Sequence, residues 1–318
     1  MFCRNSSEPR YSRTAYLAKI LCALMAKPAQ STTSHIAIPR YKRLARWQLI
    51  QLFRLDDLTQ QWIDSVSPSY YALEQFMTRE AKTAIVTGAS QGIGAGVTTL
   101  FLARGYNVVA TSRRITNSDH FGPSDQLALV DGDIAHPTTA KKIVEVAMDK
   151  FGSIEALVNN AGIFLAKPFV EFTLDDYKSL AATNIEGFLH LTQLVVKQML
   201  AQKTGGSIVS ITTAIVDHPI AGLNASVAMI TKGGLAAISR SLAMEYAKCG
   251  IRVNTVAPGI VDTPLHKNNP KEFLKTLSPM SKIAAVKDIA EAVLYLTEAS
   301  QVTGEVLHVD GGAHLGRW

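Results

Sequence analysis

The chain has 318 residues, of which 47% are hydrophobic, so it can form one large domain or two small ones around a full apolar core. Its formal net charge of +6 is uneven, because residues 1–76 hold ten Lys/Arg and five Asp/Glu whereas residues 77–318 hold 22 and 21. The larger part therefore lacks the basic stripe that nucleic acid binding needs, and no run of 18 apolar residues offers a membrane-spanning helix.

Cysteine and histidine usage also excludes some kinds of site. Of the three cysteines only Cys249 lies within residues 77–318, which rules out a disulfide framework or a cysteine-based zinc site there. This usage is typical of a reducing compartment, and we expect a cytoplasmic protein. The eight histidines show no metal-ligand spacing, so no metal is expected.

The first 76 residues differ in composition from the rest. Residues 1–54 are basic and contain a single acid, Glu8, as transit peptides do, and residues 44–66 have the apolar spacing of an amphipathic helix. Three interpretations stay open: a targeting or interaction extension that allows organelle import, a disordered basic tail with a docking helix, or a stretch upstream of the true start at Met77. We therefore divide the chain into an N-terminal extension, 1–76, and one domain, 77–318.

The domain begins with a strand, a glycine-rich turn and a helix. The apolar residues 84–86 predict a buried strand, and residues 95–105 predict a helix. Between them, Gly88 permits a tight turn, Gly92 lets backbone N–H groups approach a pyrophosphate, and Gly94 allows the helix to pack against the sheet. The turn also contains Ser90, Gln91 and Ile93. This arrangement predicts a dinucleotide site.

The next strand, residues 107–111, leads into Ser112, Arg113 and Arg114. In a Rossmann unit an acid at this point bonds the 2′-hydroxyl of NAD, whereas arginine accommodates the 2′-phosphate of NADP. The acid is absent here, so we expect NADP(H), with NAD(H) as the alternative.

Strands and helices then alternate to the end of the chain. Strands are expected at 127–130, 154–158, 206–212, 251–257 and 305–312, and helices at 137–151, 173–203, 225–248 and 287–299. Pro137 and a capping box, Thr173-x-x-Asp176, mark two of the helix starts, and the stretch 260–282 is expected to be an irregular lid. The alternation predicts an α/β fold with a doubly wound parallel sheet of the Rossmann type.

Seven pieces in this order resemble the short-chain dehydrogenase/reductase family over residues 80–312. They are Thr87-Gly88-x-x-x-Gly92-x-Gly94, Asp133-Ile134, Asn159-Asn160-Ala161-Gly162, Asn184, Lys232, Pro258-Gly259 with Thr263, and Asp310-Gly311-Gly312. The resemblance implies that Asp133 and Ile134 hold the adenine, and that Asn160, Ala161 and Gly162 pass the adenosine half. It also implies that Pro258, Gly259 and Thr263 hold the nicotinamide end. The helices at 173–203 and 225–248 would form dimers or tetramers.

One position departs from the family. Its members reduce carbonyls with a serine, a tyrosine and a lysine, the last two spaced Tyr-x-x-x-Lys so that both face one side of a helix. The lysine holds the nicotinamide ribose and lowers the pKa of the tyrosine, which passes the proton. Here Lys232 is present, but the tyrosine position is Ala228. The serine position falls on Thr212 or Thr213, of which we select Thr213.

Two replacements for the tyrosine are open. The loop 214–224 is about two residues longer than the family's usual spacing and carries Asp217-His218, so His218 is a candidate proton donor with Asp217 beside it. The other candidate is a water molecule held by Asn184, Lys232 and Thr213. The candidate catalytic residues are therefore Asn184, Thr213, Lys232 and His218.

Three functions remain open. The first is an NADP-preferring oxidoreductase that acts on a ketone, an aldehyde or the matching alcohol by an altered proton route. The second is a catalytically weak NADP(H)-binding protein that works as a sensor or partner subunit, and the third is a related lyase or isomerase without net redox chemistry. The stretches expected to line the pocket, 163–170, 214–223 and 265–283, are mostly apolar, which favours a small, mainly apolar substrate.

Overall fold

The computed structural model describes residues 81–316. The predicted extension at 1–76, its helix at 44–66 and Met77 lie outside the described residues. All helices and strands considered below belong to the described part.

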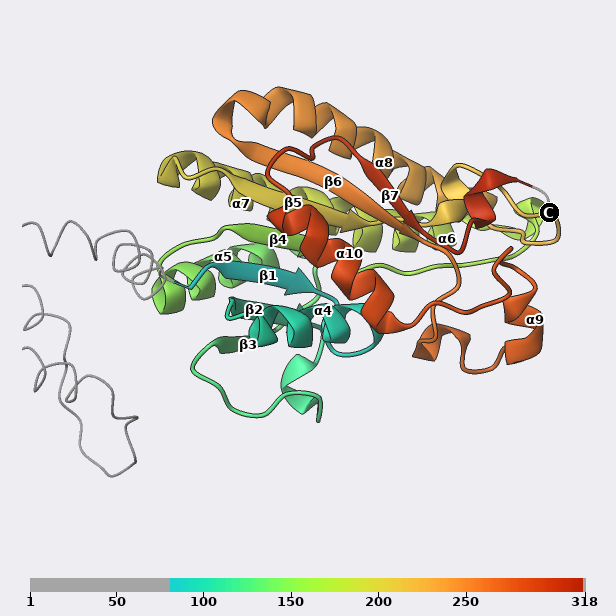
Figure 1. Cartoon of the computed structure of the whole chain (residues 1–318), viewed down its shortest axis with the longest axis horizontal. Helices are drawn as coiled ribbons and strands as arrows, with labels where there is room; N and C mark the ends of the chain where they lie inside the picture. The colour runs from blue at the N-terminus through green and yellow to red at the C-terminus, as the bar shows by residue number, and fades with distance from the viewer. Residues whose placement is uncertain (1–80, 317–318) are drawn as a thin grey trace, which may run out of the picture. The chain divides into compact units, whose positions relative to one another are not determined.

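Seven parallel strands form one sheet in the order β3-β2-β1-β4-β5-β6-β7 (Figure 1). They are β1 (Thr83–Thr87), β2 (Asn107–Ser112), β3 (Leu127–Asp131), β4 (Ala156–Asn159), β5 (Gly206–Ile211), β6 (Ile251–Pro258) and β7 (Val306–Val309). The order reverses direction between β1 and β4. This is the doubly wound Rossmann-type sheet that the alternation of patterns predicted, and its carboxyl edge at the switch point is where such sheets bind ligands.

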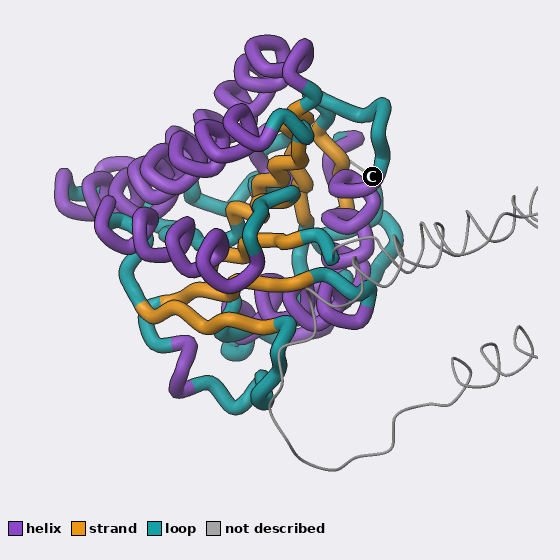
Figure 2. The backbone as a smooth tube through the Cα atoms, turned by 90° about the vertical axis from the view of Figure 1, so that its left-hand side faces the viewer, coloured by secondary structure: helices purple, strands orange, loops and turns teal. Residues whose placement is uncertain are grey.

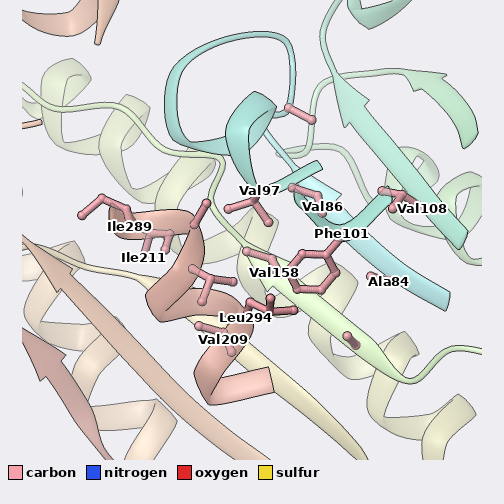
Figure 3. Packing of buried hydrophobic residues seen from close by; sticks show 14 of the residues in the cluster. Ala84, Val86, Val97, Phe101, Val108, Val158, Val209, Ile211, Ile289 and Leu294 are labelled. Carbon is pink, nitrogen blue, oxygen red and sulfur yellow. The ribbon is translucent and has the colours of Figure 1, made fainter. Parts of the chain in front are cut away.

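Both faces of the sheet are buried, which explains why its strands are apolar throughout rather than alternating. Ala84 and Val86 of β1 pack into one core cluster with Phe101 and Val158 (Figure 3). Ile85 between them packs into a second cluster on the opposite face. All five residues of β1 are buried. Successive side chains of a strand point to opposite faces, so a strand covered on both sides must be apolar at every position.

Helices cover the two faces of the sheet (Figure 2). One core cluster takes residues from α4 (Gly92–Ala103) and α10 (Val286–Glu298), and the other takes residues from α5 (Pro137–Phe151), α7 (Gly187–Gln202) and α8 (Ser226–Tyr246). Helix α4 packs closely on α10, because a Cβ at Gly96 would lie 2.2 Å from Cγ1 of Val286. Among the helices of residues 81–316, none is both long and apolar enough to cross a membrane.

Two local predictions about helix starts are confirmed. Pro137 opens α5, where the missing N–H of a proline costs nothing. Thr173 caps α6 (Leu174–Ala181), and Asp176 returns the capping-box bond to the backbone N–H of Thr173 at 2.7 Å. These starts depend on residues three or fewer apart, so the local sequence is sufficient to encode them.

Two other regions differ from the prediction. The single helix expected over 173–203 is α6 and α7 joined by a π-helical turn, Ala182–Glu186, which carries Asn184. The lid expected to be irregular over 260–282 contains a 3₁₀ turn, Pro264–His266, and a short helix, α9 (Lys271–Lys275). The remaining 3₁₀ turns are Ile115–Asn117, Phe169–Glu171, Ala214–Val216, Ala247–Cys249 and Ala313–Leu315.

Candidate active site

The glycine-rich turn leaves no room for side chains at its two ends. Gly88 and Gly92 adopt φ values of +65° and +56°, which favour glycine. A Cβ at Gly94 would lie 2.3 Å from the carbonyl oxygen of Gly88, so the helix starts directly against the turn. Asn160 fixes this geometry, because its Nδ2 donates to the carbonyl oxygens of Thr87 and Gly88 at 2.8 and 3.1 Å.

The first turn of α4 is open to an anion. Its N-cap residue, Gln91, makes no side-chain capping bond, and no acidic residue lies in the first turn. Thr263 of the lid lies over the same turn, since a Cβ at Gly92 would be 3.4 Å from its Cγ2. Gly92, predicted for the pyrophosphate, and Thr263, predicted for the nicotinamide end, therefore lie next to each other. The backbone N–H groups and the helix dipole at this turn suit a pyrophosphate.

The residues predicted to bind the adenosine half of the nucleotide lie at and just after the ends of β2 and β3. Ser112 pairs with Asp131 across the two strands, and both Arg113 and Arg114 are exposed without an ion pair among the described residues. Asp133 accepts a hydrogen bond from the N–H of Ala135 at 3.0 Å. Ile134 is buried and packs beside Gly187, where a Cβ would lie 2.8 Å from its Cγ2.

Lys232 is buried near the centre of the carboxyl edge. Its ammonium donates to the carbonyl oxygen of Ile211, the last residue of β5, at 2.9 Å. A Cβ at Gly162 would lie 3.2 Å from Nζ of Lys232 and 3.1 Å from Oδ1 of Asn184, so both groups border the same point above Gly162. Burial lowers the pKa of Lys232 from its ordinary value to about 8. The structure thus brings together Lys232 and Asn184.

Asn184 is held by three hydrogen bonds. Its Oδ1 accepts from the N–H of Ile163 at 2.8 Å, and its Nδ2 donates to the carbonyl oxygen of Ile163 and to the Thr231 hydroxyl, each at 3.0 Å. The Thr231 hydroxyl donates in turn to the carbonyl oxygen of Ala228 at 2.9 Å. Ala228 is fully buried and presents only a methyl group. This network ties the π turn to the helix that carries Lys232.

The two threonines at the end of β5 have different environments. Thr212 is buried, and its hydroxyl donates to the carbonyl oxygen of Val256 at 3.1 Å. Thr213 is half-buried, and its hydroxyl makes no hydrogen bond to any residue in the described part of the chain. Of the two positions that the sequence left open, Thr213 therefore has the free hydroxyl.

His218 has neighbours that the sequence did not predict. It is exposed, and its ring lies 6.5 Å from that of His314. The expected partner of His218, Asp217, instead bonds Nε2 of His308 on β7 at 2.9 Å. The rings of His308 and His314 stack at 3.9 Å. Hence Asp217 orients His308 rather than His218, and His218 makes no hydrogen bond within residues 81–316.

These residues near the end of β7 also adjoin the predicted nicotinamide turn. Asp310 accepts from the backbone N–H and Nδ1 of His314 at 2.7 and 2.9 Å. A Cβ at Gly259 would lie 2.8 Å from Cβ of Asp310, so the turn at Pro258 and Gly259 packs on Cβ and the backbone of Asp310. Within residues 81–316 no group of three or more His, Cys, Asp and Glu is arranged to hold a metal ion.

Sequence reasoning missed two pairs at this edge. One joins Asp217 and His308, which are 91 residues apart, and the other joins Thr116 to Asp131, which are 15 residues apart. Neither pair has a local signal, because each forms only when strands from different parts of the chain end side by side.

Comparison with known proteins gives consistent matches. Residues 88–314 match the family model described as Enoyl-(Acyl carrier protein) reductase. The 3-oxoacyl-(acyl-carrier-protein) reductase of Salmonella typhimurium is 32% identical over 248 residues, which cover 75% of this chain and all of that protein. Two solved structures each have a TM-score of 0.69 and 28% identity, and each match covers 74% of this chain and 99% of the other. They are a 3-ketoacyl-(acyl-carrier-protein) reductase from Brucella melitensis complexed with NADH, and ElxO with NADP bound.

Proposed function

The chain belongs to the short-chain dehydrogenase/reductase family, and we propose that it is an NADP-preferring oxidoreductase. We also propose that its proton donor is not a tyrosine. As a member of that family it is an NAD(P)-dependent oxidoreductase. The nicotinamide, when bound, supplies or accepts the hydride. The observation that carries the rest of the proposal is the buried Lys232 ammonium beside Asn184, with Ala228 one helical turn before it.

The chain's residues fit the dinucleotide. The glycine-rich turn and the uncapped first turn of α4 would hold the pyrophosphate, and Asp133 with Ile134 would hold the adenine. The unpaired guanidinium groups of Arg113 and Arg114 favour NADP over NAD, because they suit the 2′-phosphate and no acid occupies the position of Ser112. Pro258, Gly259 and Thr263 would hold the nicotinamide end.

We assign the proton to Lys232. An ammonium has three N–H donors, of which Ile211 takes one. The side chain at Ala228 ends at Cβ, so a water molecule held by Lys232, Asn184 and Thr213 would carry a proton from the ammonium to the substrate oxygen. The amine left behind takes a proton from solvent. A pKa of about 8 suits an acid that works near neutral pH.

His218 is the less favoured donor. Its ring is exposed and lies beside His314, and Asp217 is engaged with His308. Within residues 81–316 His218 makes no hydrogen bond to Lys232 or Thr213, so it lacks a proton route comparable to the one proposed for Lys232.

A mainly apolar carbonyl or alcohol is the proposed substrate. Large apolar side chains are exposed on the loop 214–224, on the lid and on the last 3₁₀ turn: Leu223, Leu265, Phe273, Met280 and Leu315. We also propose a homodimer or homotetramer, since Leu174, Tyr177, Leu200, Ile230 and Met244 are exposed on α6, α7 and α8. A cytoplasmic location stays a prediction.

The test is NADPH fluorescence on the full chain, first with nucleotide alone and then with a panel of apolar aldehydes, ketones and quinones. The proposal predicts a rise on binding and a carbonyl-dependent decay that Lys232→Met abolishes and His218→Gln leaves intact. Decay that depends on His218 would reassign the donor. Binding without decay, recovered only in Ala228→Tyr, would support the sensor or partner-subunit function instead. Absence of binding would overturn the proposal.

A further inference from the structure

The six residues after β2 form a short segment, 113–118, that is fixed at several points. Ile115 is fully buried in the core cluster that contains β1 and β2. Thr116 bonds the Asp131 carboxylate twice, through its backbone N–H at 3.0 Å and its hydroxyl at 2.5 Å. Ser118 closes the segment, because its hydroxyl donates to the carbonyl oxygen of Ser90 in the glycine-rich turn at 3.3 Å.

These contacts surround two arginines that have no partner of their own. Arg113 and Arg114 precede Ile115, are exposed, and make no ion pair or hydrogen bond with any residue of 81–316. Ordering a residue on binding costs backbone and side-chain conformational entropy, and a backbone that is already fixed removes the backbone part of that cost. The fixed segment 113–118 therefore determines the backbone positions from which the two arginine side chains extend.

We propose that Thr116 and Asp131 are positioning residues for NADP selectivity, because their paired hydrogen bonds fix segment 113–118 and so place Arg113 and Arg114 at the 2′-phosphate. The inference rests on the NADP preference proposed above. Neither Thr116 nor Asp131 is assigned a contact with the nucleotide.

The charge of Asp131 makes this role specific. Both oxygens of Asp131 accept hydrogen bonds from neutral donors of Thr116, which hold the carboxylate at Thr116 and leave its negative charge in place. The same bonds, the hydroxyl bond first, hold the pKa of Asp131 below its ordinary value, so the group is ionised at neutral pH. An ionised carboxylate can only accept hydrogen bonds, so Asp131 is the acceptor for both the N–H and the hydroxyl of Thr116.

The test measures binding on the full chain without any substrate. Dissociation constants for NADPH, NADH, 2′,5′-ADP and ADP are determined by titration calorimetry, and selectivity is the ratio between the members of each pair. Thr116→Val removes the hydroxyl at nearly constant volume, and Thr116→Ser restores it. Asp131→Ala removes both acceptors, whereas Asp131→Asn keeps an acceptor for the backbone N–H and a donor for the hydroxyl. Thr99→Val is the matched control, because Thr99 is also exposed and its hydroxyl bonds only the carbonyl oxygen of Ala95.

The expected result is a loss confined to the phosphorylated ligands. Thr116→Val and Asp131→Ala should weaken NADPH and 2′,5′-ADP by about 5- to 10-fold and change NADH and ADP by less than about twofold. Thr116→Ser, Asp131→Asn and Thr99→Val should keep the wild-type ratio within about twofold to threefold. Unchanged NADH binding also shows that the variants are folded.

Two failures are distinguishable. If Arg113→Met with Arg114→Met removes the NADPH preference but Thr116→Val does not, the arginines act without positioning and the inference is overturned while the NADP proposal stands. If the wild type shows no preference, or the double arginine variant keeps it, the NADP proposal fails and the inference fails with it.

Discussion

The buried ammonium of Lys232 is the residue on which the proposed chemistry depends. Its charge has lost most of its hydration, since Lys232 is 9% exposed, and it is compensated by one hydrogen bond to Ile211. In a low-dielectric site an ammonium gives up its proton more readily than in water. The lowered pKa makes the ammonium a suitable acid for the proposed reaction.

The pH dependence of reduction follows from this pKa. The acid must be protonated, so kcat/KM for carbonyl reduction with NADPH should be level below about pH 8 and fall as pH rises through about 8. The reverse reaction, in which the amine accepts the proton, should rise over the same range. Steady-state rates from pH 6 to 10 check both arms. A reduction rate that falls near pH 6.5 would indicate a histidine instead.

The lowered pKa of Lys232 also means that its burial costs folding stability, so a Lys232→Met variant should be more stable than the wild type. Below about pH 8 the wild-type lysine is charged in both states, and folding includes the cost of burying the charge. Methionine removes that cost, so the variant should be more stable by roughly 3 kcal/mol there. The difference should shrink between about pH 8 and 10.5, where the folded lysine is already neutral. Urea unfolding at pH 7 and pH 10 measures this difference.

Introducing a tyrosine at position 228 should raise the rate. Ala228→Tyr places a phenol one turn before Lys232, and a positioned general acid contributes about 10²–10⁴-fold. Turnover of the best carbonyl with NADPH gives the measurement, and Ala228→Phe is the matched control because it adds the ring without the hydroxyl. Since Ala228 is fully buried beside Leu180 and Val227, thermal melts must show that both variants fold. Equal rates in the two variants would contradict the assigned position.

At the scale of elements, the strand, turn and helix at β1 and α4 place the proposed pyrophosphate site. Gly94→Ala should abolish NADPH binding, because the added Cβ would lie 2.3 Å from a backbone oxygen that cannot move away without shifting the turn. The overpacking should also cost about 1–3 kcal/mol of stability. Gly105→Ala is a useful contrast: its Cβ would meet nothing within 4 Å, so it tests backbone strain without a clash. Titration calorimetry and melts of both variants distinguish the two effects.

The π turn shows why a helix pattern is not a full description of a helix. Residues 173–203 have a continuous helical pattern, but the backbone widens at Ala182–Glu186 and Asn184 lies in the widened turn. Such turns are frequent at functional sites. Asn184 bonds both the N–H and the carbonyl oxygen of Ile163, a segment outside the helix. The contact between Asn184 and Ile163 cannot be read from the helical residue pattern, and it lies where the α-helix changes to a π-helical turn.

At the scale of the whole domain, one long-range pair joins the segment after Thr213 to the last strand. Asp217 and His308 are 91 residues apart and bond at 2.9 Å. Asp217→Asn and His308→Gln should each destabilise the fold, and a double-mutant cycle should give a coupling of about 0.5–1.5 kcal/mol. Hydrogen exchange of residues 214–224 should be faster in both variants. Additive effects would show that the contact does not tether the loop.

Local residue patterns were enough to predict the order of the strands and helices, the glycine-rich turn and the capping box, and they place Ala228 four residues before Lys232. These features rest on periodicity, turn chemistry and spacing, which are local properties of the chain. The folded arrangement was needed to show that Thr213 rather than Thr212 has the free hydroxyl. It was also needed to show that Asp217 contacts His308 rather than His218, and that Thr116 bonds Asp131. Each of these depends on which strand ends lie side by side, and the pairing of distant strands is fixed by burial of the whole sheet.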